Sequence, residues 1–551
     1  MSFRKAKLRA ALAGVLLVLS LATGCSPADP EPVNIPSTTT PAPNAVPATP
    51  TDLPPSATPA PTAGPASLVN PGFEEPASGA ALPGWSHSGA ADAILTEKNG
   101  HESEARLTHK SDQIYEAETS QVVTGLANDW YTLRAWVRSS GGQNAAYLAL
   151  QCGGQETKVH IPSTMPGYRW IQLVVSNQVT SGQCTIRLYS HGNPGTWASF
   201  DDIELVPGRA VLSILGADIS SLPKSEALGG VYRYSDGTQA DAVQILHDSG
   251  MNYARLRVWV DSADGYHGKE ELLAMALRLD SLGINLLVDF HYSDAWADPG
   301  KQYKPAAWEN YDFEQLKQAV YDHTYDICSS LVAQGTPPAM VQVGNEINAG
   351  MLWPDGDYNH FDNLAELLKA GAQAVKDCNS STLVMLHIAE GGDNDLARWW
   401  FDNITRREVP FDVIGISYYP FWHGNLAQLQ FNLSDISARY GKDVIVVETA
   451  YAFTPLEEDS LANILGRARM IEGYPMTPAG QRAMLRDIMS VVRAVPDGRG
   501  LGVFWWDATW TMVPGNGWDP ADPKSENAWE NQALFDFDDR ALPALDEFLN
   551  P

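Results

Sequence analysis

The spacing of apolar positions changes near residue 207. Between residues 68 and 206, short runs such as 130–137, 170–175 and 184–189 alternate apolar and polar positions, separated by turns rich in Gly, Asn, Ser and Pro. Successive side chains of a strand point to opposite faces of a sheet. A period of two with no helical stretch therefore predicts an antiparallel β-sandwich over residues 67–207.

After residue 207, apolar runs are followed by polar loops and, in most cases, by helix-length patterns such as 269–282, 313–334 and 363–378. We count eight strand candidates: 211–218, 253–259, 285–292, 340–346, 382–389, 411–419, 443–451 and 500–506. Eight such repeats predict an α/β domain, a closed (β/α)8 TIM barrel over residues 208–551. An open doubly wound sheet is the alternative, but no Gly-rich nucleotide loop follows the first strand.

The N-terminus has the form of a targeting segment. Four basic residues precede the apolar run 10–22, and Thr23 and Gly24 lead to Cys25. The run is too short to span a bilayer comfortably. It resembles a bacterial lipoprotein signal peptide, 1–24, with cleavage before Cys25 and lipidation of its thiol, although Ala22 stands where Leu is commoner. We expect an exported protein, lipid-anchored at the cell surface or outer membrane; ordinary secretion is the alternative.

Residues 25–66 are dominated by Pro, Thr, Ala and Ser. Such a composition buries no core and predicts an extended linker. Of the five cysteines, four remain after Cys25 is set aside. Among three possible pairings we favour those within each domain, Cys152 with Cys184 and Cys328 with Cys378; free buried thiols are the alternative.

The composition excludes some classes of binding partner. A chain of 551 residues with a net charge of −29 lacks the concentrated Lys and Arg that bind phosphate backbones. We expect no nucleic-acid partner, no membrane contact beyond the lipid anchor, and a monomer. The 17 tryptophans suggest sugar stacking, although tryptophan also fills cores.

Two carboxylates carry the candidate chemistry. Glu346 ends the fourth strand candidate and Glu448 lies near the end of the seventh. Catalytic groups of such barrels stand where strands end, and strands four and seven face each other. Glycosidic bond cleavage needs two carboxyl groups, about 5 to 5.5 Å apart in a retaining enzyme. A structural ion pair is the alternative for each glutamate alone.

The neighbouring positions fit these roles. Arg255 and Arg257 share one face of the second strand, where a guanidinium would keep Glu448 ionised. Burial and the charge of Glu448 should raise the pKa of Glu346, which then holds the proton. Other strand ends offer polar groups and flat faces for a sugar, although each could be core packing: His291, Asp294, Trp296, Tyr419 and Trp505.

Five segments resemble the signatures of glycoside hydrolase family 53: LGADIS (215–220), DFHYSDAWADPGKQ (289–302), VQVGNEIN (341–348), SYYP (417–420) and VETAY (447–451). The resemblance implies endo-β-1,4-galactanase activity on galactan or arabinogalactan side chains of pectin, with Glu346 as acid/base and Glu448 as nucleophile. It also implies that Asn345 contacts the 2-hydroxyl of the cleaved sugar, that Arg255 is the strand-two arginine, and that Trp505 floors the site.

The same resemblance implies no cofactor for catalysis but a possible structural calcium between the last two long loops. Its ligands would be Glu457, Asp459, Leu461, Asn463, Asn527 and Glu530, of which Glu457, Leu461, Asn527 and Glu530 depart from the expected residue types. Segments 70–75 and 199–204 resemble the first and last strands of jelly-roll carbohydrate-binding modules of family 61. In related modules, acidic residues there hold calcium, so Glu74 and Asp202 are candidate ligands.

Two other functions stay open. One is a related barrel hydrolase acting on another β-1,4-glycan, mannan or glucan. The other is a surface glycan-binding protein whose barrel is not catalytic.

Overall fold

The computed structural model describes residues 66–75, 82–165, 167 and 169–549. The expected signal peptide, Cys25 and all but the last residue of the linker lie outside the described residues. Residues 65–551 form one compact unit. Among the described residues, no helix is long and apolar enough to cross a membrane.

The N-terminal domain consists of two five-stranded antiparallel sheets, which confirms the sandwich. One sheet runs in the order β1 (Ser86–Gly89), β4 (Tyr115–Thr124), β9 (Gln183–Gly192), β6 (Ala145–Cys152) and β7 (Gln155–His160). The other runs β2 (Ile94–Lys98), β3 (Ala105–Lys110), β10 (Trp197–Pro207), β5 (Trp130–Ser139) and β8 (Ile171–Gln178), with a 3-10 turn η1 (Ala91–Ala93) before β2. In β5, Leu133, Ala135 and Val137 are fully buried, as the alternation requires.

The expectation of a strand at residues 70–75 is wrong. Asn70 and Phe73 have left-handed backbones, with φ of 50° and 56°. The Asn70 side chain accepts the amide of Glu75 at 3.0 Å and donates to its carbonyl at 3.2 Å. Asn followed by Pro and Gly forms a turn because Asn tolerates positive φ and its side chain hydrogen-bonds the local backbone.

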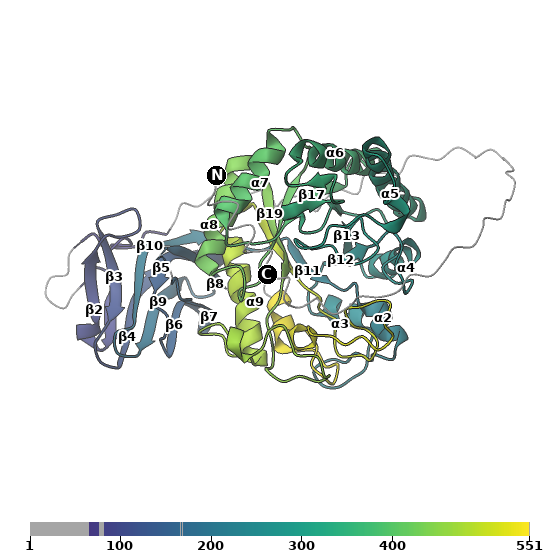
Figure 1. The fold of residues 1–551 in the computed structure, drawn as a ribbon. Helices are drawn as coiled ribbons and strands as arrows, with labels where there is room; N and C mark the ends of the chain where they lie inside the picture. Colours follow the sequence, from purple (N-terminus) through teal and green to yellow (C-terminus); the bar gives the residue numbers. More distant parts are fainter. Residues whose placement is uncertain (1–65, 76–81, 166, 168, 550–551) are drawn as a thin grey trace, which may run out of the picture. The chain divides into compact units, whose positions relative to one another are not determined.

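The C-terminal domain is a closed barrel of eight parallel strands, as expected. The strands are β11 (Ile214–Asp218), β12 (Tyr253–Val258), β13 (Asn285–Phe290), β14 (Met340–Val343), β17 (Leu383–Ile388), β18 (Val413–Ser417), β19 (Asp443–Thr449) and β20 (Gly500–Trp505). The ring closes where β20 pairs with β11. Figure 1 shows helices arranged around these strands.

The helices are α2 (Leu222–Ala227), α3 (Ala242–Asp248), α4 (Lys269–Asp280), α5 (Phe313–Gln334), α6 (Phe361–Cys378), α7 (Asn394–Thr405), α8 (Leu426–Tyr440) and α9 (Pro478–Arg493). Short 3-10 segments are η2 (Ala306–Trp308), η3 (Ile347–Ala349), η4 (Arg467–Arg469), η5 (Pro496–Gly498), η6 (Glu530–Gln532) and η7 (Pro543–Leu549). A small hairpin pairs β15 (Gly350–Met351) with β16 (Gly356–Asp357).

The barrel interior is apolar at one end and polar at the other. Tyr253 and Met340, each the first residue of its strand, form one buried apolar cluster with Leu287 and with Phe504 of β20. Polar side chains occupy inward positions further along the same strands. The apolar layer closes the bottom of the barrel, so chemistry is confined to the carboxyl ends.

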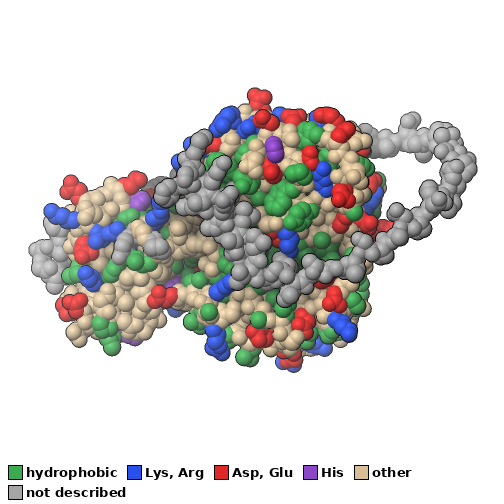
Figure 2. Space-filling view, in the orientation of Figure 1, with side chains coloured by type: hydrophobic (Ala, Val, Ile, Leu, Met, Phe, Trp, Pro, Cys, Tyr) green, Lys and Arg blue, Asp and Glu red, His purple; other side chains and the backbone are tan. Residues whose placement is uncertain are grey.

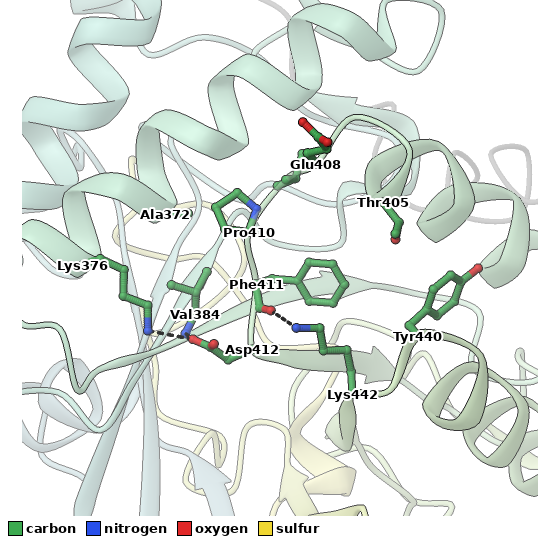
Figure 3. A pocket seen from close by; sticks show the side chains of 11 residues that line it. Ala372, Lys376, Val384, Thr405, Glu408, Pro410, Phe411, Asp412, Tyr440 and Lys442 are labelled. Carbon is green, nitrogen blue, oxygen red and sulfur yellow. Dashed lines mark hydrogen bonds and ion pairs between the residues drawn. The ribbon is translucent and has the colours of Figure 1, made fainter.

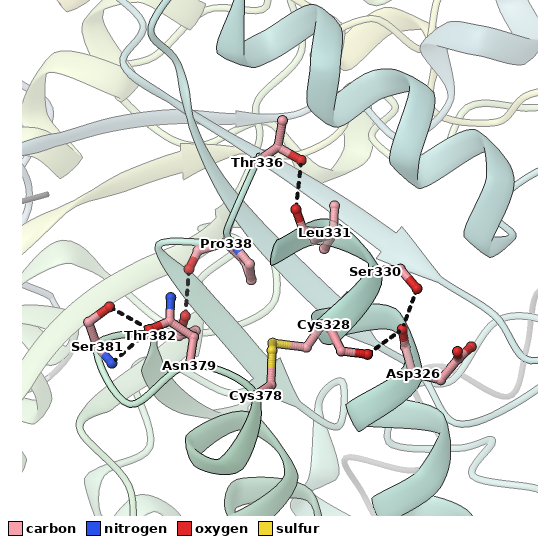
Figure 4. Close-up of a disulfide and its surroundings, with 11 residues drawn as sticks. Asp326, Cys328, Ser330, Leu331, Thr336, Pro338, Cys378, Asn379, Ser381 and Thr382 are labelled. Carbon is pink, nitrogen blue, oxygen red and sulfur yellow. Dashed lines mark hydrogen bonds between the residues drawn. A yellow bond between two sulfur atoms is a disulfide. The ribbon is translucent and has the colours of Figure 1, made fainter. Parts of the chain in front are cut away.

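Two disulfides lie within the domains, the pairing that the sequence favours. Cys152 on β6 joins Cys184 on β9, and Cys328 on α5 joins Cys378 at the end of α6. Figure 4 shows the second bridge beside the loops that lead into β14 and β17. It therefore ties together two adjacent helices of the barrel wall.

Two barrel helices cover the edge strand of the sandwich. Gln430 of α8 accepts the backbone N–H of Gln172 at 2.6 Å and donates to its carbonyl at 2.8 Å. Two residues along β8, Ser490 of α9 makes the same two bonds with Val174, at 3.3 and 3.2 Å. An unpaired strand edge is prone to unwanted pairing, and these side chains satisfy it.

Candidate active site

Glu346 lies just beyond the end of β14, on a backbone that few residues adopt. The strand ends at Val343, earlier than residue 346, because Gly344 turns the chain with φ of 89°. Glu346 itself is left-handed, with φ of 46° and ψ of 49°. A non-glycine residue in this region stores strain, which the surroundings must hold. The Glu346 N–H points to Nδ1 of His387 at 3.4 Å.

Glu448 lies in β19 and its two carboxylate oxygens have separate partners. Oε1 is 2.8 Å from Nη2 of Arg255, and Oε2 accepts the Tyr419 hydroxyl at 2.9 Å. Burial raises the pKa of Glu448, while the charge of Arg255 and the bond from Tyr419 act in the opposite direction. Both contacts favour the ionised form.

The two glutamates have different electrostatic surroundings. The pKa of Glu346 lies well above its ordinary value, first because of burial and then because of the negative charge of Glu448. Glu448 has a smaller upward shift because Arg255 offsets part of its burial. When two interacting carboxyls differ in this way, the proton resides on the one with the higher pKa, here Glu346.

Arg255 organises the polar end of the barrel. It is 1% exposed and it contacts several acceptors besides Glu448. Nη1 is 2.8 Å from Asp218, Nη2 is 2.8 Å from both Asp289 and Asn345, and Nε donates to Gln342 at 3.2 Å. Burial lowers its pKa, but the carboxylates Asp289, Glu448 and Asp218 outweigh this and raise it above the ordinary value. Arg255 therefore remains charged.

Several members of this network were not singled out from the sequence: Asp218, Asp289, Gln342, His387 and Ser417. A signal existed for most of them. Each interrupts or ends an otherwise apolar strand run at a position that faces inward, as Arg255 does. Period-two polar interruptions in parallel strands mark the inside of a barrel.

Two residues expected to bind sugar have their polar atoms engaged within the protein. His291 receives the Trp259 indole N–H at 3.2 Å on Nδ1, and its Nε2 is 3.0 Å from Asp289. Asp294 accepts the backbone N–H groups of Asp261 and Ala306 at 3.0 and 2.8 Å. In this structure they brace loops around the site, a role that residue type alone does not distinguish from sugar binding.

The aromatic residues divide into two groups. Trp505 at the end of β20 is completely buried, and its indole donates to the Gln532 carbonyl at 2.8 Å. Its ring has no exposed face on which a sugar could stack. Trp296 is partly exposed and packs under the guanidinium of Arg257, 4.2 Å from the ring centroid. Further tryptophans from the loops after β20 surround it, a cluster visible in the sequence as a Trp-rich segment: Trp506, Trp510 and Trp518.

A cavity of about 370 Å³ lies at the opposite end of the barrel. Its lining comes from α6, the start of β17, the end of α7, the loop 408–412 that precedes β18, and the end of α8 with Lys442, as Figure 3 shows. Lys376 pairs with Asp412 at 2.8 Å, and Lys442 donates to the Phe411 carbonyl. Because its cations are paired and the glutamates lie at the other end, this cavity is not the catalytic site.

The expected calcium ligands of the barrel loops are only partly brought together. Asp459 accepts the amides of Leu461 and Asn527, both at 2.8 Å, and Glu530 Oε1 accepts the Glu458 amide. Asn463 Oδ1 and Glu530 Oε2 are buried without a partner. Burial raises the pKa of Glu530 to about 7. Unpaired buried oxygens fit a hard cation.

Other members of that set differ from the expectation. Glu457 and Leu461 are exposed, and the Asn527 side chain bonds to the backbone of Trp510 and Trp529 at 2.9 and 2.8 Å. No group of three or more Asp, Glu, His or Cys side chains among the described residues forms a metal cluster.

In the sandwich, the expected acidic pair gains a third member. The three acidic side chains surround Gly72. A Cβ atom added to this glycine would lie 3.6 Å from Oδ1 of Asp202, 3.7 Å from Oδ1 of Asp201 and 3.9 Å from Cγ of Glu74. Asp201, which the sequence reasoning missed, is fully buried. Asp202 Oδ2 is 3.0 Å from Nδ1 of His101, so an ion pair already engages this carboxylate when the histidine is protonated.

The fold and the site together define a class of enzyme. A closed (β/α)8 barrel presents two glutamates at the carboxyl ends of its strands. Glu448 is contacted by an arginine and a tyrosine, and Glu346 has a raised pKa that favours its protonated form. This arrangement is that of a glycoside hydrolase. The sequence model of glycosyl hydrolase family 53 matches residues 214–548, and the chain belongs to this family.

Two relatives agree with this assignment. The chain is 33% identical over 380 residues to an endo-β-1,4-galactanase of Bacillus subtilis (strain 168), covering 63% of this chain and 87% of that protein. The solved Ignisphaera aggregans GH53 catalytic domain is 40% identical with a TM-score of 0.60, covering 62% of this chain and 97% of that domain. The solved TmCBM61 in complex with β-1,4-galactotriose is 27% identical, covering 26% of this chain and 99% of that one, with a TM-score of 0.23.

Proposed function

We propose that the protein hydrolyses β-1,4-galactosidic linkages within galactan or arabinogalactan side chains of pectin, with retention of anomeric configuration. The observation that carries the proposal is the unequal pair: Glu448 held by Arg255 and Tyr419, and Glu346 with its strongly raised pKa. Endo-galactanases among the relatives support the substrate.

Glu448 is the nucleophile and Glu346 the acid/base. Glu346 gives its proton to the glycosidic oxygen as the leaving-group bond breaks and the Glu448 oxygen bonds to the anomeric carbon. The resulting ester carries no charge, so the negative charge of Glu448, which adds to the effect of burial in raising the pKa of Glu346, is removed and that pKa falls. Glu346 then takes a proton from water, whose oxygen attacks the anomeric carbon and releases ionised Glu448.

Product analysis on linear β-1,4-galactan tests this function. The wild type should release short galactooligosaccharides, and Glu448→Ala and Glu346→Ala should be inactive while folded. The matched control is Glu366→Ala, an exposed glutamate of α6, which should keep full activity. If Glu448→Ala behaves like the wild type, the proposal is wrong.

Azide distinguishes the two roles. With an activated aryl β-1,4-galactobioside, azide should replace the lost nucleophile in Glu448→Ala and give the α-azide. In Glu346→Ala the ester still forms, so azide should give the β-azide. Exchanged products would reverse the assignment. Faster hydrolysis of mannan or glucan would change the substrate, and galactan binding without hydrolysis would favour a non-catalytic binding protein.

The sandwich adds affinity for the same polymer. Its outer face carries aromatic and cationic side chains such as Trp136 and Trp170, with Arg138 lying 4.7 Å from the Trp170 ring centroid. Aromatic faces suit sugar rings. An inactive Glu448→Ala chain should bind galactan more tightly than the same chain lacking residues 67–207, and equal affinities would reduce the sandwich to a spacer.

Cys25 anchors the chain through a lipid, and calcium stabilises the loops around Glu530. Cys25→Ala should move the protein from the membrane fraction to the medium. A chelator should lower the melting temperature of the wild type, and calcium should restore it. A Glu530→Gln variant should be insensitive to both, because Glu530 Oε2 is one of the unpaired oxygens.

A further inference from the structure

The backbone that carries Glu346 is held by side chains rather than by strand pairing. Pairing of β14 with its neighbours ends at Val343, and residues 344–349, the Glu346 loop, follow directly. Three carbonyls of this loop accept hydrogen bonds from side chains: Gly344 from Gln342 at 3.2 Å, Asn345 from Gln302 at 2.7 Å, and Ile347 from Trp400 at 2.9 Å. Buried carbonyls need such partners, so these donors replace the missing strand partners.

Glu346 is the one residue of its loop that is not buried. Its five companions from Gly344 to Ala349 are buried, whereas Glu346 is partly exposed. Its backbone is left-handed, with φ of 46°, a conformation that persists only where the surroundings hold it. The direction of its side chain depends on the peptide units on either side of its Cα. The groups that fix these peptides therefore also fix where the carboxyl points.

Gln302 reaches the loop from a turn that is itself rigid. The turn is closed by two backbone bonds of 2.9 Å between Asp298 and Lys301. Gln302 follows directly and is 2% exposed. Its carbonyl accepts the N–H of Trp353 at 2.6 Å, and its side-chain amide makes a second bond to the Asp298 carbonyl at 3.2 Å. The donor that meets Asn345 is thus fixed from several sides.

The bond from Gln302 acts on the peptide unit that immediately precedes Glu346. The side chain of Asn345 has anchors of its own, because Oδ1 accepts from Arg255 and Nδ2 donates to the Ala297 carbonyl, both at 2.8 Å. Glu448 is held separately, by Arg255 and Tyr419. Loss of the Gln302 amide should therefore displace Glu346 and leave Glu448 in place.

We propose that Gln302 is a positioning residue, whose amide fixes the peptide before Glu346 and so directs the Glu346 carboxyl to the glycosidic oxygen. The inference rests on the proposed role of Glu346 as acid/base. Gln302 acts only through Glu346. Its removal should therefore harm the steps in which Glu346 transfers a proton and spare the attack by Glu448.

Two leaving groups separate these effects. Gln302→Met keeps the length of the side chain but has no donor. A sugar leaves with the proton of Glu346, whereas dinitrophenolate leaves without it. In Gln302→Met, kcat/KM on galactan should fall about a hundredfold. With 2,4-dinitrophenyl β-1,4-galactobioside, kcat/KM should stay close to the wild-type value. This selective loss is the expected signature.

Azide gives a second readout with the same aryl substrate. Glu346 also acts as base when water attacks the ester, so kcat of Gln302→Met should fall. KM should fall with it because the ester accumulates. Azide attacks the ester without a base and should restore kcat. A general loss of structure would not be corrected by azide.

Gln481→Met is the matched control. Gln481 of α9 is fully buried, and its amide donates to the carbonyls of Tyr451 and Ala533, both at 2.9 Å. The variant loses the same kind of bonds at another place, so any change in kcat/KM should be equal for both substrates. Gln302→Asn keeps an amide that is one methylene too short to reach Asn345. It should show the selective loss and serves as the test if Gln302→Met does not fold.

Equal losses on both substrates in the folded Gln302 variants would overturn the inference, as would undiminished activity on galactan. Glu346→Ala is the reference and should show the selective loss in full. If Glu346→Ala keeps its activity on galactan, or loses it equally on both substrates, the proposed role of Glu346 fails. If only the Gln302 variants lack the selective loss, the positioning role alone fails.

Discussion

The hydroxyl of Tyr419 stabilises the ionised form of Glu448, the proposed nucleophile, and Tyr419→Phe tests this directly. The ring is 5% exposed and its hydroxyl donates to Glu448 Oε2 at 2.9 Å. Burial and then the charge of Glu448 raise the pKa of Tyr419 well above its ordinary value, so it remains a donor throughout the working range. The substitution removes one oxygen and keeps the packing of the ring.

The magnitude follows from the kind of bond. A hydrogen bond to a charged acceptor contributes about 1.5 to 3 kcal/mol, which corresponds to about one to two pH units. The bond lowers the pKa of Glu448, so its loss raises that pKa. In the proposed mechanism Glu448 must be ionised to attack the anomeric carbon, so the acid limb of kcat/KM should move upward by about one to two pH units. Because the glutamates are coupled, the limb reports the pair.

The assay is kcat/KM on galactan across the acid range. The control is Tyr418→Phe, because this neighbouring tyrosine is also buried but donates to the Gly424 carbonyl at 2.9 Å. Its acid limb should match the wild type. If Tyr419→Phe shifts the limb by less than about 0.3 unit, the bond to Glu448 does not stabilise the ionised form and the reasoning is refuted.

Three further results are expected. Replacing both Cys328 and Cys378 by Ser should lower the free energy of unfolding by about 2 to 4 kcal/mol, measured by calorimetry, and an unchanged melting temperature would show that the bridge adds nothing. Gln430→Ala should cost about 1 to 3 kcal/mol in urea unfolding because it leaves edge groups of β8 unpaired, whereas Gln373→Ala on α6 should be neutral. Arg255→Lys keeps the positive charge but loses the planar guanidinium that hydrogen-bonds Gln342, Asp218 and Asp289 at once, so kcat/KM should fall about a hundredfold. A near-normal kcat/KM would contradict the central role of Arg255.

The surface agrees with the composition. Figure 2 shows acidic and basic side chains interspersed over the face in view, without a concentrated basic area there. A chain with a net charge of −29 could still bind a polyanion through a local basic patch, and that face shows none. This fits a neutral polymer as the partner.

Strand candidates were predicted well because periodicity is a local property. The barrel strands lie inside the expected runs, and α5 matches its expected bounds, Phe313–Gln334. The ends were less accurate: residues 344–346 are not strand, because Gly344 and Glu346 have positive φ. Backbone turns of this kind depend on neighbours that a hydrophobic pattern does not describe.

The sequence by itself determined the two domains, the barrel and the position of Glu346 and Glu448 at or just beyond strand ends. The spacing of apolar residues and the order of the strands can both be read from the sequence. Only the tertiary structure decided which polar groups meet. Arg255 reaches Asn345 across 90 residues, and Tyr419 reaches Glu448 across 29. The tertiary structure also decided that the ring nitrogens of His291 contact Trp259 and Asp289, and that Nδ1 of His387 faces the Glu346 N–H. Closure of the barrel brings strands together that are distant in sequence, and residue types alone do not specify which side chains then fall within hydrogen-bond distance.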